Sequence, residues 1–363
     1  MWRRGADLDG NVANFVETEQ ILEANGYLAS YVQVRGSIPL LWEQIVDLTY
    51  KPRFKLINLE DTPKVVERHF SDLRRRYGSV TAVDLINQRG GESLLSQAYA
   101  NAMQAFVNDE IRYVQFDFHQ VCGHVHFERL SLLYDQIADD VKKHRYFLLS
   151  TRQETLEEQT GVIRSNCIDC LDRTNVTQSM LGRKSMEAQL QRIEIFQKDE
   201  TINQHTNFDN LFKILWANHG DEISIQYSGT PALKGDFVRY GQRTIQGILG
   251  DGHYALARYY FNNFCDGAKQ DAIDLLQGHY TVSREISSPF QDRGLATVAS
   301  VPLASALVLA SIVLATMSLR QGRQDARRFI FSAFWASLAL GIMTFVRING
   351  RVFCNRPRLQ KML

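Results

Sequence analysis

Apolar and polar positions alternate along residues 1–281 in short stretches that predict strands and helices in turn. Residues 31–35 alternate as a half-buried strand does, and 54–58 is a second candidate strand. Apolar positions at helical spacing follow Pro63, and Gly78 ends that segment. The remaining elements alternate in the same way, with strands predicted at 80–86, 111–118, 145–150 and 161–164 and helices at 93–107, at 130–141 and from Thr174 onward. This order predicts an α/β fold with a mainly parallel sheet covered by helices on both faces.

The region 208–278 has apolar and aromatic residues at helical spacing, which indicates packing helices. Between two such stripes, 227–244 carries the cations Lys234, Arg239 and Arg243. Two interpretations stay open. This segment is either a solvated loop or a basic collar that holds an anionic lipid headgroup or the anionic surface of a membrane.

Two long uncharged runs mark the C-terminal part of the chain. No charged residue occurs at 294–319 or at 329–346. A membrane-spanning helix needs about 20 mostly apolar residues, with a range of roughly 17–25. Both runs are therefore predicted to span a membrane, and the alternative is a buried helical hairpin in a soluble core.

The predicted organisation is a catalytic domain at 1–281, a linker at 282–293, the two spans and a tail at 349–363. Two spans place both chain ends on one side of the membrane. Arginines flank both runs, so the bias of basic residues toward the cytosol orients them only weakly. A thiolate such as the one expected at Cys167, in the stretch 164–175, favours the cytosol, so we expect the catalytic domain and the tail to be cytosolic. The basic residues of the connector and tail are Arg320, Arg323, Arg327, Arg328, Arg347, Arg351, Arg356, Arg358 and Lys361, with Asp325 among them.

Composition narrows the class of protein. The chain has 363 residues, which is enough for one large globular domain. Its net charge of +1 gives no support for a nucleic-acid partner. Its five cysteines are an odd, scattered set, which argues against a disulfide framework and for a reducing compartment. The first residues are polar, unlike a signal peptide.

The stretch 164–175 carries the strongest chemical signal. Cys167 and Arg173 have five residues between them, and the stretch joins a predicted strand to a predicted helix. Such a loop can direct its backbone N–H groups at a phosphate, with the positive end of the helix behind it. Cys167, as a thiolate, would attack the phosphorus, and Arg173 would fork onto two phosphate oxygens. The scheme needs no metal or cofactor. The other residues expected to bind substrate in this loop are Ile168, Cys170, Leu171, Asp172 and Thr174.

The leaving alkoxide needs a proton, which an acid must supply. Two carboxylates in the loop repel a phosphate unless one is protonated or turned away, so one of them is expected to have a raised pKa. We favour Asp169, two residues after Cys167, as the acid. Asp117, after another predicted strand, is the competitor because a separate loop can carry an acid over the phosphate.

The run Arg-Ser-Asn-Cys-Ile-Asp-Cys-Leu-Asp-Arg-Thr-Asn-Val at 164–176 resembles the signature of the Sac-domain phosphoinositide phosphatases. The likeness covers nearly the whole chain and is closest to the membrane-anchored branch of the endoplasmic reticulum and Golgi. It implies removal of phosphate from phosphatidylinositol monophosphates, chiefly the 4-phosphate, with Cys167 as nucleophile and Arg173 as phosphate ligand. The other segments that carry the resemblance are Arg3-Arg4-Gly5, 13–20, 35–39 with Trp42, 116–119 and 232–237.

The chain departs from that family at its start. A full Sac domain has an N-terminal subdomain before the Arg-Arg-Gly motif, which here begins at Arg3. We therefore expect a catalytic subdomain with its anchor but without the front portion. The alternative function is a catalytically weak, membrane-tethered scaffold that binds lipid through its basic face.

Two further patterns have competing interpretations. Cys167 and Cys170 have the spacing of a thioredoxin-like redox pair, but the Arg that follows so soon favours phosphate binding. Structural zinc usually takes two separated pairs of ligands, and the sequence has one Cys/His cluster, so a surface loop is favoured over zinc. That cluster consists of His119, Cys122, His124 and His126.

Overall fold

The computed structural model describes residues 3–44, 46–49, 53–57, 60–123, 126–241, 243–282, 296–320 and 326–359. The chain forms two compact units. We call Arg3–Glu43 with Phe54–Arg258 the sheet unit, and Gln44–Arg53 with Tyr259–Leu363 the helical unit. Each is described by itself.

A seven-stranded sheet organises the sheet unit, in the order β6-β5-β9-β2-β7-β8 with β1 paired to β2. The pairings β6–β5, β5–β9 and β9–β2 are parallel. The last residues of β2 pair with β9, whereas its first residues pair with β7 in the antiparallel direction. The parallel centre of the sheet is therefore the part that the sequence predicted. The strands are β1 (Val16–Ala24), β2 (Tyr27–Arg35), β5 (Ser79–Asp84), β6 (Ile111–Gln115), β7 (Phe147–Leu149), β8 (Thr155–Glu157) and β9 (Gly161–Asn166), and β3 (Trp42–Gln44) pairs separately with β4 (Phe54–Leu56).

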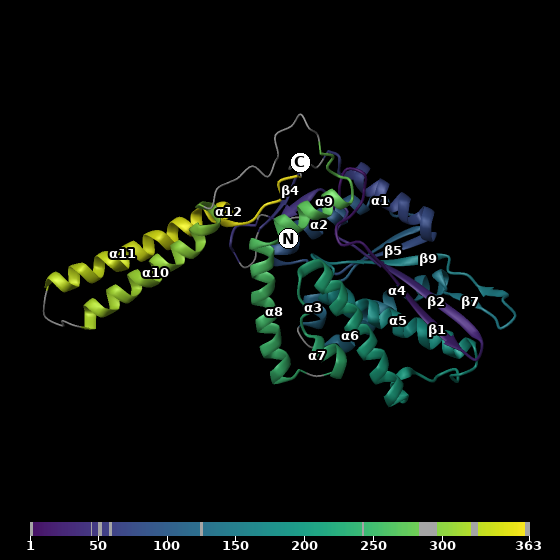
Figure 1. The fold of residues 1–363 in the computed structure, drawn as a ribbon. Helices are drawn as coiled ribbons and strands as arrows, with labels where there is room; N and C mark the ends of the chain where they lie inside the picture. The colour runs from purple at the N-terminus through teal and green to yellow at the C-terminus, as the bar shows by residue number, and fades with distance from the viewer. Residues whose placement is uncertain are drawn as a thin grey trace. The chain divides into compact units, whose positions relative to one another are not determined.

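Helices cover both faces of this sheet, as Figure 1 shows. On one face α1 (Thr62–Tyr77) and α2 (Ser93–Met103) pack their apolar sides on β5 and β9. On the other face lie α4 (Ser131–His144) and α5 (Asp172–Arg192), and α6 (Thr206–Ser228) packs beside the end of α5. The predicted α/β fold with a mainly parallel sheet between helices is confirmed.

The antiparallel edge was not predicted, because β1 does not alternate between apolar and polar residues. The side chains of β1 that point inward are polar and form hydrogen bonds instead. Gln20 donates from Nε2 to the Gly182 carbonyl at 2.9 Å, and Thr18 contacts His219 at 3.0 Å. A pattern of hydrophobicity alone cannot show a strand whose buried face is polar.

The predicted strand 111–118 ends early, at Gln115. Asp117 then caps the short helix α3 (Phe118–Cys122) by accepting a hydrogen bond from the Gln120 N–H at 2.9 Å. The prediction missed this N-cap signal.

The predicted helical region contains α6, α7 (Gly235–Tyr240), α8 (Ile245–Phe264) and α9 (Asp266–Leu276). Short 3₁₀ turns occur at Gly90–Glu92, Phe127–Leu130 and Ile202–Gln204.

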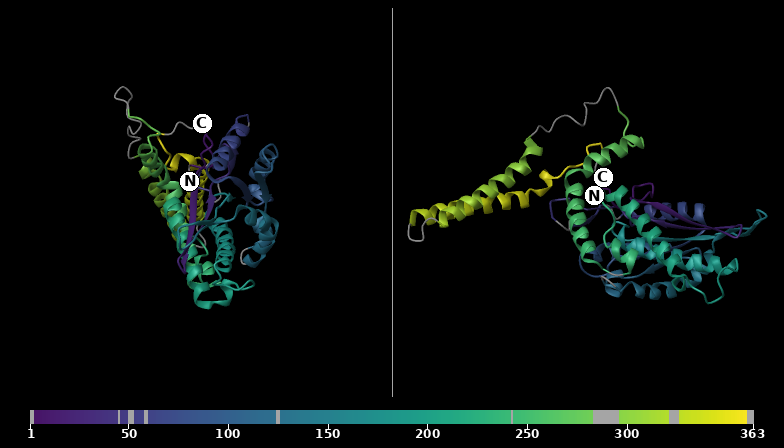
Figure 2. Two further views of the ribbon diagram at one scale, coloured as in Figure 1. Left: turned by 90° about the vertical axis from the view of Figure 1, so that its right-hand side faces the viewer. Right: turned by 60° about the horizontal axis from the view of Figure 1, so that its bottom comes forward.

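The two uncharged runs form α10 (Ala296–Arg320) and α11 (Ala326–Ile348), which lie side by side (Figures 1 and 2). Ser332 on α11 donates a hydrogen bond to the Ala315 carbonyl on α10 at 2.9 Å. Both helices are long and apolar enough to cross a bilayer, and most of their described side chains are exposed. Of the predicted linker 282–293, only Val282 lies within the described residues, and Arg323, Asp325 and residues 360–363 also lie outside them.

The predicted tail packs within the helical unit after the short helix α12 (Gly350–Phe353). The backbone N–H groups of Arg358 and Leu359 donate to Asp271 Oδ1 of α9 at 2.7 and 3.0 Å. The chain that follows α11 is therefore bonded to the helix that precedes α10. If α10 and α11 span a membrane, α9 and this tail lie on the same side of it.

Candidate active site

The reactive stretch lies where the sequence predicts it, between the end of β9 and the start of α5. Cys167 follows the last residue of β9 and is fully buried. Its Sγ accepts hydrogen bonds from the Cys170 backbone N–H at 3.1 Å and from Thr174 Oγ1 at 3.4 Å. Cys170 has a positive φ of 57°, which turns the chain back over the sulfur. The carboxyl ends of parallel strands are where such sheets hold ligands.

The second sulfur faces acceptors rather than donors. Cys170 Sγ lies 3.0 Å from the Gly36 carbonyl and 3.5 Å from the Cys167 carbonyl. Burial raises the pKa of Cys170, but its hydrogen bonds with Cys167 and the charge of Arg164 outweigh burial and lower that pKa. All five cysteines are free thiols. This environment does not favour the redox interpretation of the Cys167–Cys170 pair.

The state of the Cys167 sulfur differs from the thiolate that we expected. Burial raises the pKa of Cys167 well above its usual value, and Cys170 and the charge of Asp169 raise it further. The positive charge of Arg173 opposes them but is outweighed. In this conformation Cys167 is therefore a thiol, because its two hydrogen-bond donors do not make up for the water that a thiolate loses on burial.

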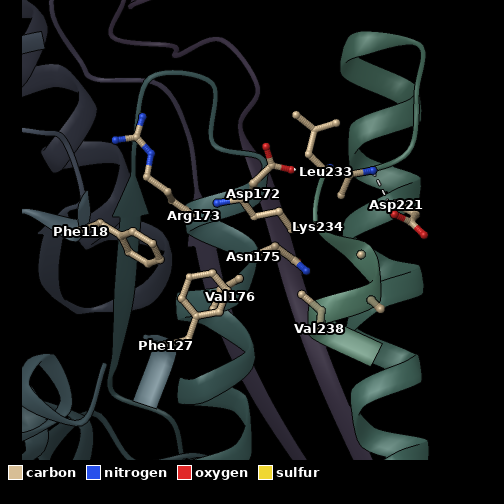
Figure 3. Close-up of a pocket in the computed structure, with 13 residues that line it drawn as sticks. Phe118, Phe127, Asp172, Arg173, Asn175, Val176, Asp221, Leu233, Lys234 and Val238 are labelled. Carbon is tan, nitrogen blue, oxygen red and sulfur yellow. Dashed lines mark hydrogen bonds between the residues drawn. The ribbon is translucent and has the colours of Figure 1, made fainter. Parts of the chain in front are cut away.

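Arg173 is bound to a carboxylate instead of facing an open anion site. Its Nη1 and Nη2 donate to the two oxygens of Glu92 at 3.0 and 3.1 Å. Nη1 also reaches the Leu85 carbonyl and Asn87 Oδ1, both at 3.2 Å. In Figure 3 its guanidinium points away from Leu233. The two guanidinium donors that we expected to bind a phosphate thus bind Glu92.

Asp169 is the carboxylate that lies next to the sulfur, with Oδ1 3.5 Å from Cys167 Sγ. Burial raises its pKa, but the positive charges of Arg4, Arg173 and Arg258 outweigh burial and hold the pKa below its usual range. Asp169 is consequently ionised near neutral pH in this conformation.

Asp172, in the first turn of α5, has the opposite character. Burial raises its pKa to about 6, and the charge of Asp169 adds to that rise, although Arg258 lowers it. Its Oδ1 accepts from the Leu233 N–H at 2.9 Å, and Arg258 Nη1 lies 3.6 Å from its Oδ2. The expected separation of two carboxyl pKa values is present, but the raised one belongs to Asp172.

The backbone of the loop is closed on its own side chains. The N–H groups of Cys170 and Leu171 point at Cys167 Sγ and at Asp169 Oδ1, the latter at 3.3 Å. The Ile168 carbonyl accepts from Arg4 Nη1 at 3.2 Å. An incoming phosphate therefore has to replace these internal contacts before the loop can surround it.

A cavity adjoins the start of α5 (Figure 3) and contains about 450 Å³ of space, part of it open to solvent. Asp172, Arg173, Asp221 and Lys234 contribute its charged groups, while Cys167 is not among the residues that line it. Its other lining residues are mostly apolar and are Phe118, Phe127, Asn175, Val176, Ala217, Ala232, Leu233, Gly235 and Val238.

The three cations of the predicted basic collar are in different situations. Arg239 pairs with Asp221 and donates to Asn218 at 3.0 Å. Arg243 pairs with Asp236 at 2.5 Å and with Asp251 at 2.7 Å. Lys234 lines the cavity, and its Nζ has no hydrogen-bond or ion-pair partner among the described residues, so it is the member of the collar that remains available to an anion.

Asp117, the other candidate for the acid, binds backbone N–H groups. Besides capping α3, its Oδ2 accepts from the Gln88 N–H at 2.9 Å. The Cys/His cluster was predicted to be a surface loop rather than a zinc site, and in the described part of the chain no three His, Cys, Asp or Glu side chains gather in a metal-binding arrangement. His124 lies outside the described residues, and Cys122 is buried in the core.

Several residues of this site were not predicted. Arg35 is fully buried, where burial lowers its pKa to about 10, and its Nη2 donates to Asn175 Oδ1 at 3.2 Å. Asn14 donates to the Asp169 carbonyl at 2.7 Å. Arg4, Asn14 and Arg35 lie in the short motifs singled out in the sequence, which was the available signal. Glu92 and Arg258 lie in no motif.

The chain is similar to a known family and to curated proteins. Residues 1–123 match the family model described as the SacI homology domain. The chain is 60% identical to "Phosphoinositide phosphatase SAC6" of Arabidopsis thaliana, over 99% of this chain and 61% of that protein. It is 39% identical to "Phosphatidylinositol-3-phosphatase SAC1" of Drosophila melanogaster, over 98% of this chain and 61% of the relative. The protein of that name in Saccharomyces cerevisiae is 35% identical, over 99% of this chain and 59% of its own length. The chain thus spans about 60% of the length of these curated relatives.

Proposed function

On the premise of this similarity, we propose that the chain is a phosphoinositide phosphatase of the SacI homology family that uses Cys167 as its nucleophile. One observation supports the proposal most. At the carboxyl end of β9, the sulfur of Cys167 receives two hydrogen-bond donors from the loop that starts α5. Donors aimed at a sulfur stabilise it as an anion, which is the form that attacks phosphorus.

The reaction begins when the substrate phosphate replaces Glu92 as the partner of Arg173. Arg173 already lowers the pKa of Cys167, and its move toward the phosphate strengthens that effect while the thiol proton leaves to solvent. The Cys167 thiolate then attacks phosphorus, a sulfur–phosphorus bond forms, and the bond from phosphorus to the inositol oxygen breaks. Water subsequently attacks the phosphocysteine and releases inorganic phosphate and the thiolate.

We assign the proton transfer to Asp169 because it is the carboxylate within 3.5 Å of the sulfur. Its pKa is low here because of three cations, and a bound phosphate shares those cations and adds its own negative charge. Both effects raise the pKa, so Asp169 can give a proton to the leaving inositol oxygen. It then takes a proton from the attacking water.

The substrate class follows from the family, and the isomer is the finer part of the proposal. We propose phosphatidylinositol monophosphates, chiefly the 4-phosphate. The Drosophila and Saccharomyces relatives are named phosphatidylinositol-3-phosphatases, which favours the 3-phosphate as the second candidate. We assign Lys234, in the cavity beside Arg173, to binding the part of the headgroup that lies outside the reactive loop. Arg239 is paired with Asp221 instead.

We also propose that α10 and α11 anchor the chain in the membrane of the endoplasmic reticulum or Golgi, with 1–281 as the catalytic domain and 282–293 as the linker. The catalytic domain and the tail face the cytosol in this proposal. The bond between the tail and α9 supports a hairpin whose two ends lie on one side.

The test is phosphate release by the purified full chain reconstituted in vesicles that contain the 3-, 4- or 5-phosphate of phosphatidylinositol. We expect release from the monophosphates, chiefly the 4-phosphate, its loss in Cys167→Ser, and its retention in Cys265→Ser, which lies in the helical unit. Equal release by the wild-type and Cys167→Ser proteins would overturn the proposal. Lipid binding without release by the wild-type chain would favour the tethered scaffold instead.

A further inference from the structure

The outward side of α8 is apolar over several turns. Ile245, Leu249 and Leu256 are 81%, 71% and 72% exposed, and Ile248 is 55% exposed. Their spacing puts them on one side of the helix, and Tyr260 continues the row. We call Ile245, Ile248, Leu249 and Leu256 the α8 outer face.

The charged residues of α8 point the other way, toward the reactive loop. Asp251 accepts from the Lys234 N–H at 3.0 Å and pairs with Arg243. Arg258 donates to Thr230 Oγ1 and to Ser224 Oγ, both at 2.8 Å, and approaches Asp172. A helix on an aqueous surface has the reverse arrangement, with charges outward and aliphatic side chains inward.

The charge pattern also decides which partner suits this face. The exposed residues of α8 include no Asp, Glu, Lys or Arg, so no carboxylate would repel an anionic lipid headgroup. By contrast, the exposed Leu132 on α4 lies next to the exposed Asp135 and Asp139. An uncharged aliphatic face matches the boundary between headgroups and acyl chains.

The chain itself keeps a bilayer within reach of α8. A membrane that α10 and α11 enter lies within the reach of the chain that connects α8 to α10, at most about 3.3–3.6 Å per residue. Association with that membrane is therefore intramolecular, and its effective concentration is high.

From these observations we infer that the α8 outer face rests on the lipid surface of the membrane that anchors the chain, with its leucine and isoleucine side chains at the acyl boundary. The inference depends on the proposed anchoring by α10 and α11, but not on phosphatase activity. Because the inner side of α8 holds Asp172 and the 230–234 turn, seating α8 on lipid places the cavity of Figure 3 beside the headgroup layer.

The test places an environment-sensitive fluorophore on Leu249→Cys, and on Leu132→Cys as the matched control, in the full chain reconstituted in phosphatidylcholine–phosphatidylserine vesicles. The labelled wild-type chain supplies the background of the native cysteines. We expect the Leu249→Cys probe to be quenched by spin labels on lipid acyl chains and shielded from iodide, and the Leu132→Cys probe to behave oppositely. Equal quenching of both probes by iodide would overturn the inference. Shielding of the Leu249→Cys probe from both quenchers would also overturn it, because the face would then be covered by protein, such as a second copy.

A functional arm keeps the two proposals distinguishable. Replacing Leu249 and Leu256 together by Glu removes aliphatic contact with lipid and is expected to lower the rate on bilayer substrate about tenfold. The rate on a water-soluble, short-chain phosphatidylinositol phosphate is expected to stay unchanged. An equal loss on both substrates would contradict membrane seating, since the lesion would then lie in the fold or the chemistry. Absence of any activity in the wild-type chain leaves the quenching result valid and counts against the proposed function alone.

Discussion

Glu92 holds Arg173 by two hydrogen bonds, at 3.0 and 3.1 Å, so that the two carboxylate oxygens face the two terminal nitrogens of the guanidinium. A phosphate would take the same two donors. Glu92 therefore occupies the position of an anionic ligand, and under the proposed function it would compete with the substrate. The buried sulfur of Cys167 and the closed loop belong to the same resting state of the site.

Removing this competition is expected to increase activity. The Asn87 N–H donates to Glu92 Oε2 at 2.9 Å, and the amide oxygen in Glu92→Gln can still accept that hydrogen bond. The substitution removes the negative charge that binds Arg173. We expect KM to fall about fivefold, since a partly exposed pair of this kind is worth about 1 kcal/mol. Steady-state kinetics on phosphatidylinositol 4-phosphate measure it, with the exposed Glu67→Gln as control. A rise in KM would mean that Glu92 orients Arg173 for the phosphate instead of competing with it.

Leaving-group dependence identifies the acid. Asp169→Asn should slow hydrolysis of the lipid, which has a poor alkoxide leaving group, by about a hundredfold, because general acids contribute roughly 10²–10⁴-fold. It should spare an aryl phosphate, whose leaving group needs no proton. Asp172→Asn is the isosteric comparison and should change both substrates alike. The account of proton transfer fails if Asp172→Asn, and not Asp169→Asn, selectively slows the poor leaving group.

Much of this architecture was predictable because hydrophobic pattern and loop chemistry carry it. Helices α1 and α2 have apolar sides at the predicted spacing, and the run around Cys167 joins a strand to a helix as expected. The same pattern could not show β1, whose buried positions are Thr18 and Gln20. Nor could it show that Phe118 begins a helix, since that depends on the cap made by Asp117.

The state of the site was beyond sequence reasoning. That Cys167 is buried, that Glu92 binds Arg173 and that Asp172 has the raised pKa all depend on groups distant along the chain. Motif spacing predicts which residues meet a phosphate. It does not show what they contact without one.

Buried neutral histidine is expected to make stability depend on pH. Burial and the charge of Arg164 lower the pKa of His69 to about 3, while His69 keeps its contact to the Gly10 carbonyl at 2.9 Å. The unfolded chain binds a proton below about pH 6.5 and the folded chain does not. The stabilisation is therefore complete above pH 6.5 and is lost as the pH falls toward 3, by about 1.4 kcal/mol per pH unit from this residue.

Unfolding followed between pH 7 and 4 by denaturant titration checks this prediction. His69→Gln should flatten the acid side of the stability profile, whereas His253→Gln, at an exposed position, should leave it unchanged. Parallel profiles for the wild-type and His69→Gln proteins would show that His69 is protonated in the folded chain.

The central claim is that Cys167 forms a covalent bond to phosphorus. The direct measurement is mass spectrometry of the chain quenched in acid during turnover of phosphatidylinositol 4-phosphate. The account predicts one phosphoryl group on the peptide that contains Cys167, present in Cys170→Ser and absent in Cys167→Ser. A phosphoryl group on another residue would contradict it. Continued turnover by the Cys167→Ser protein would contradict it as well.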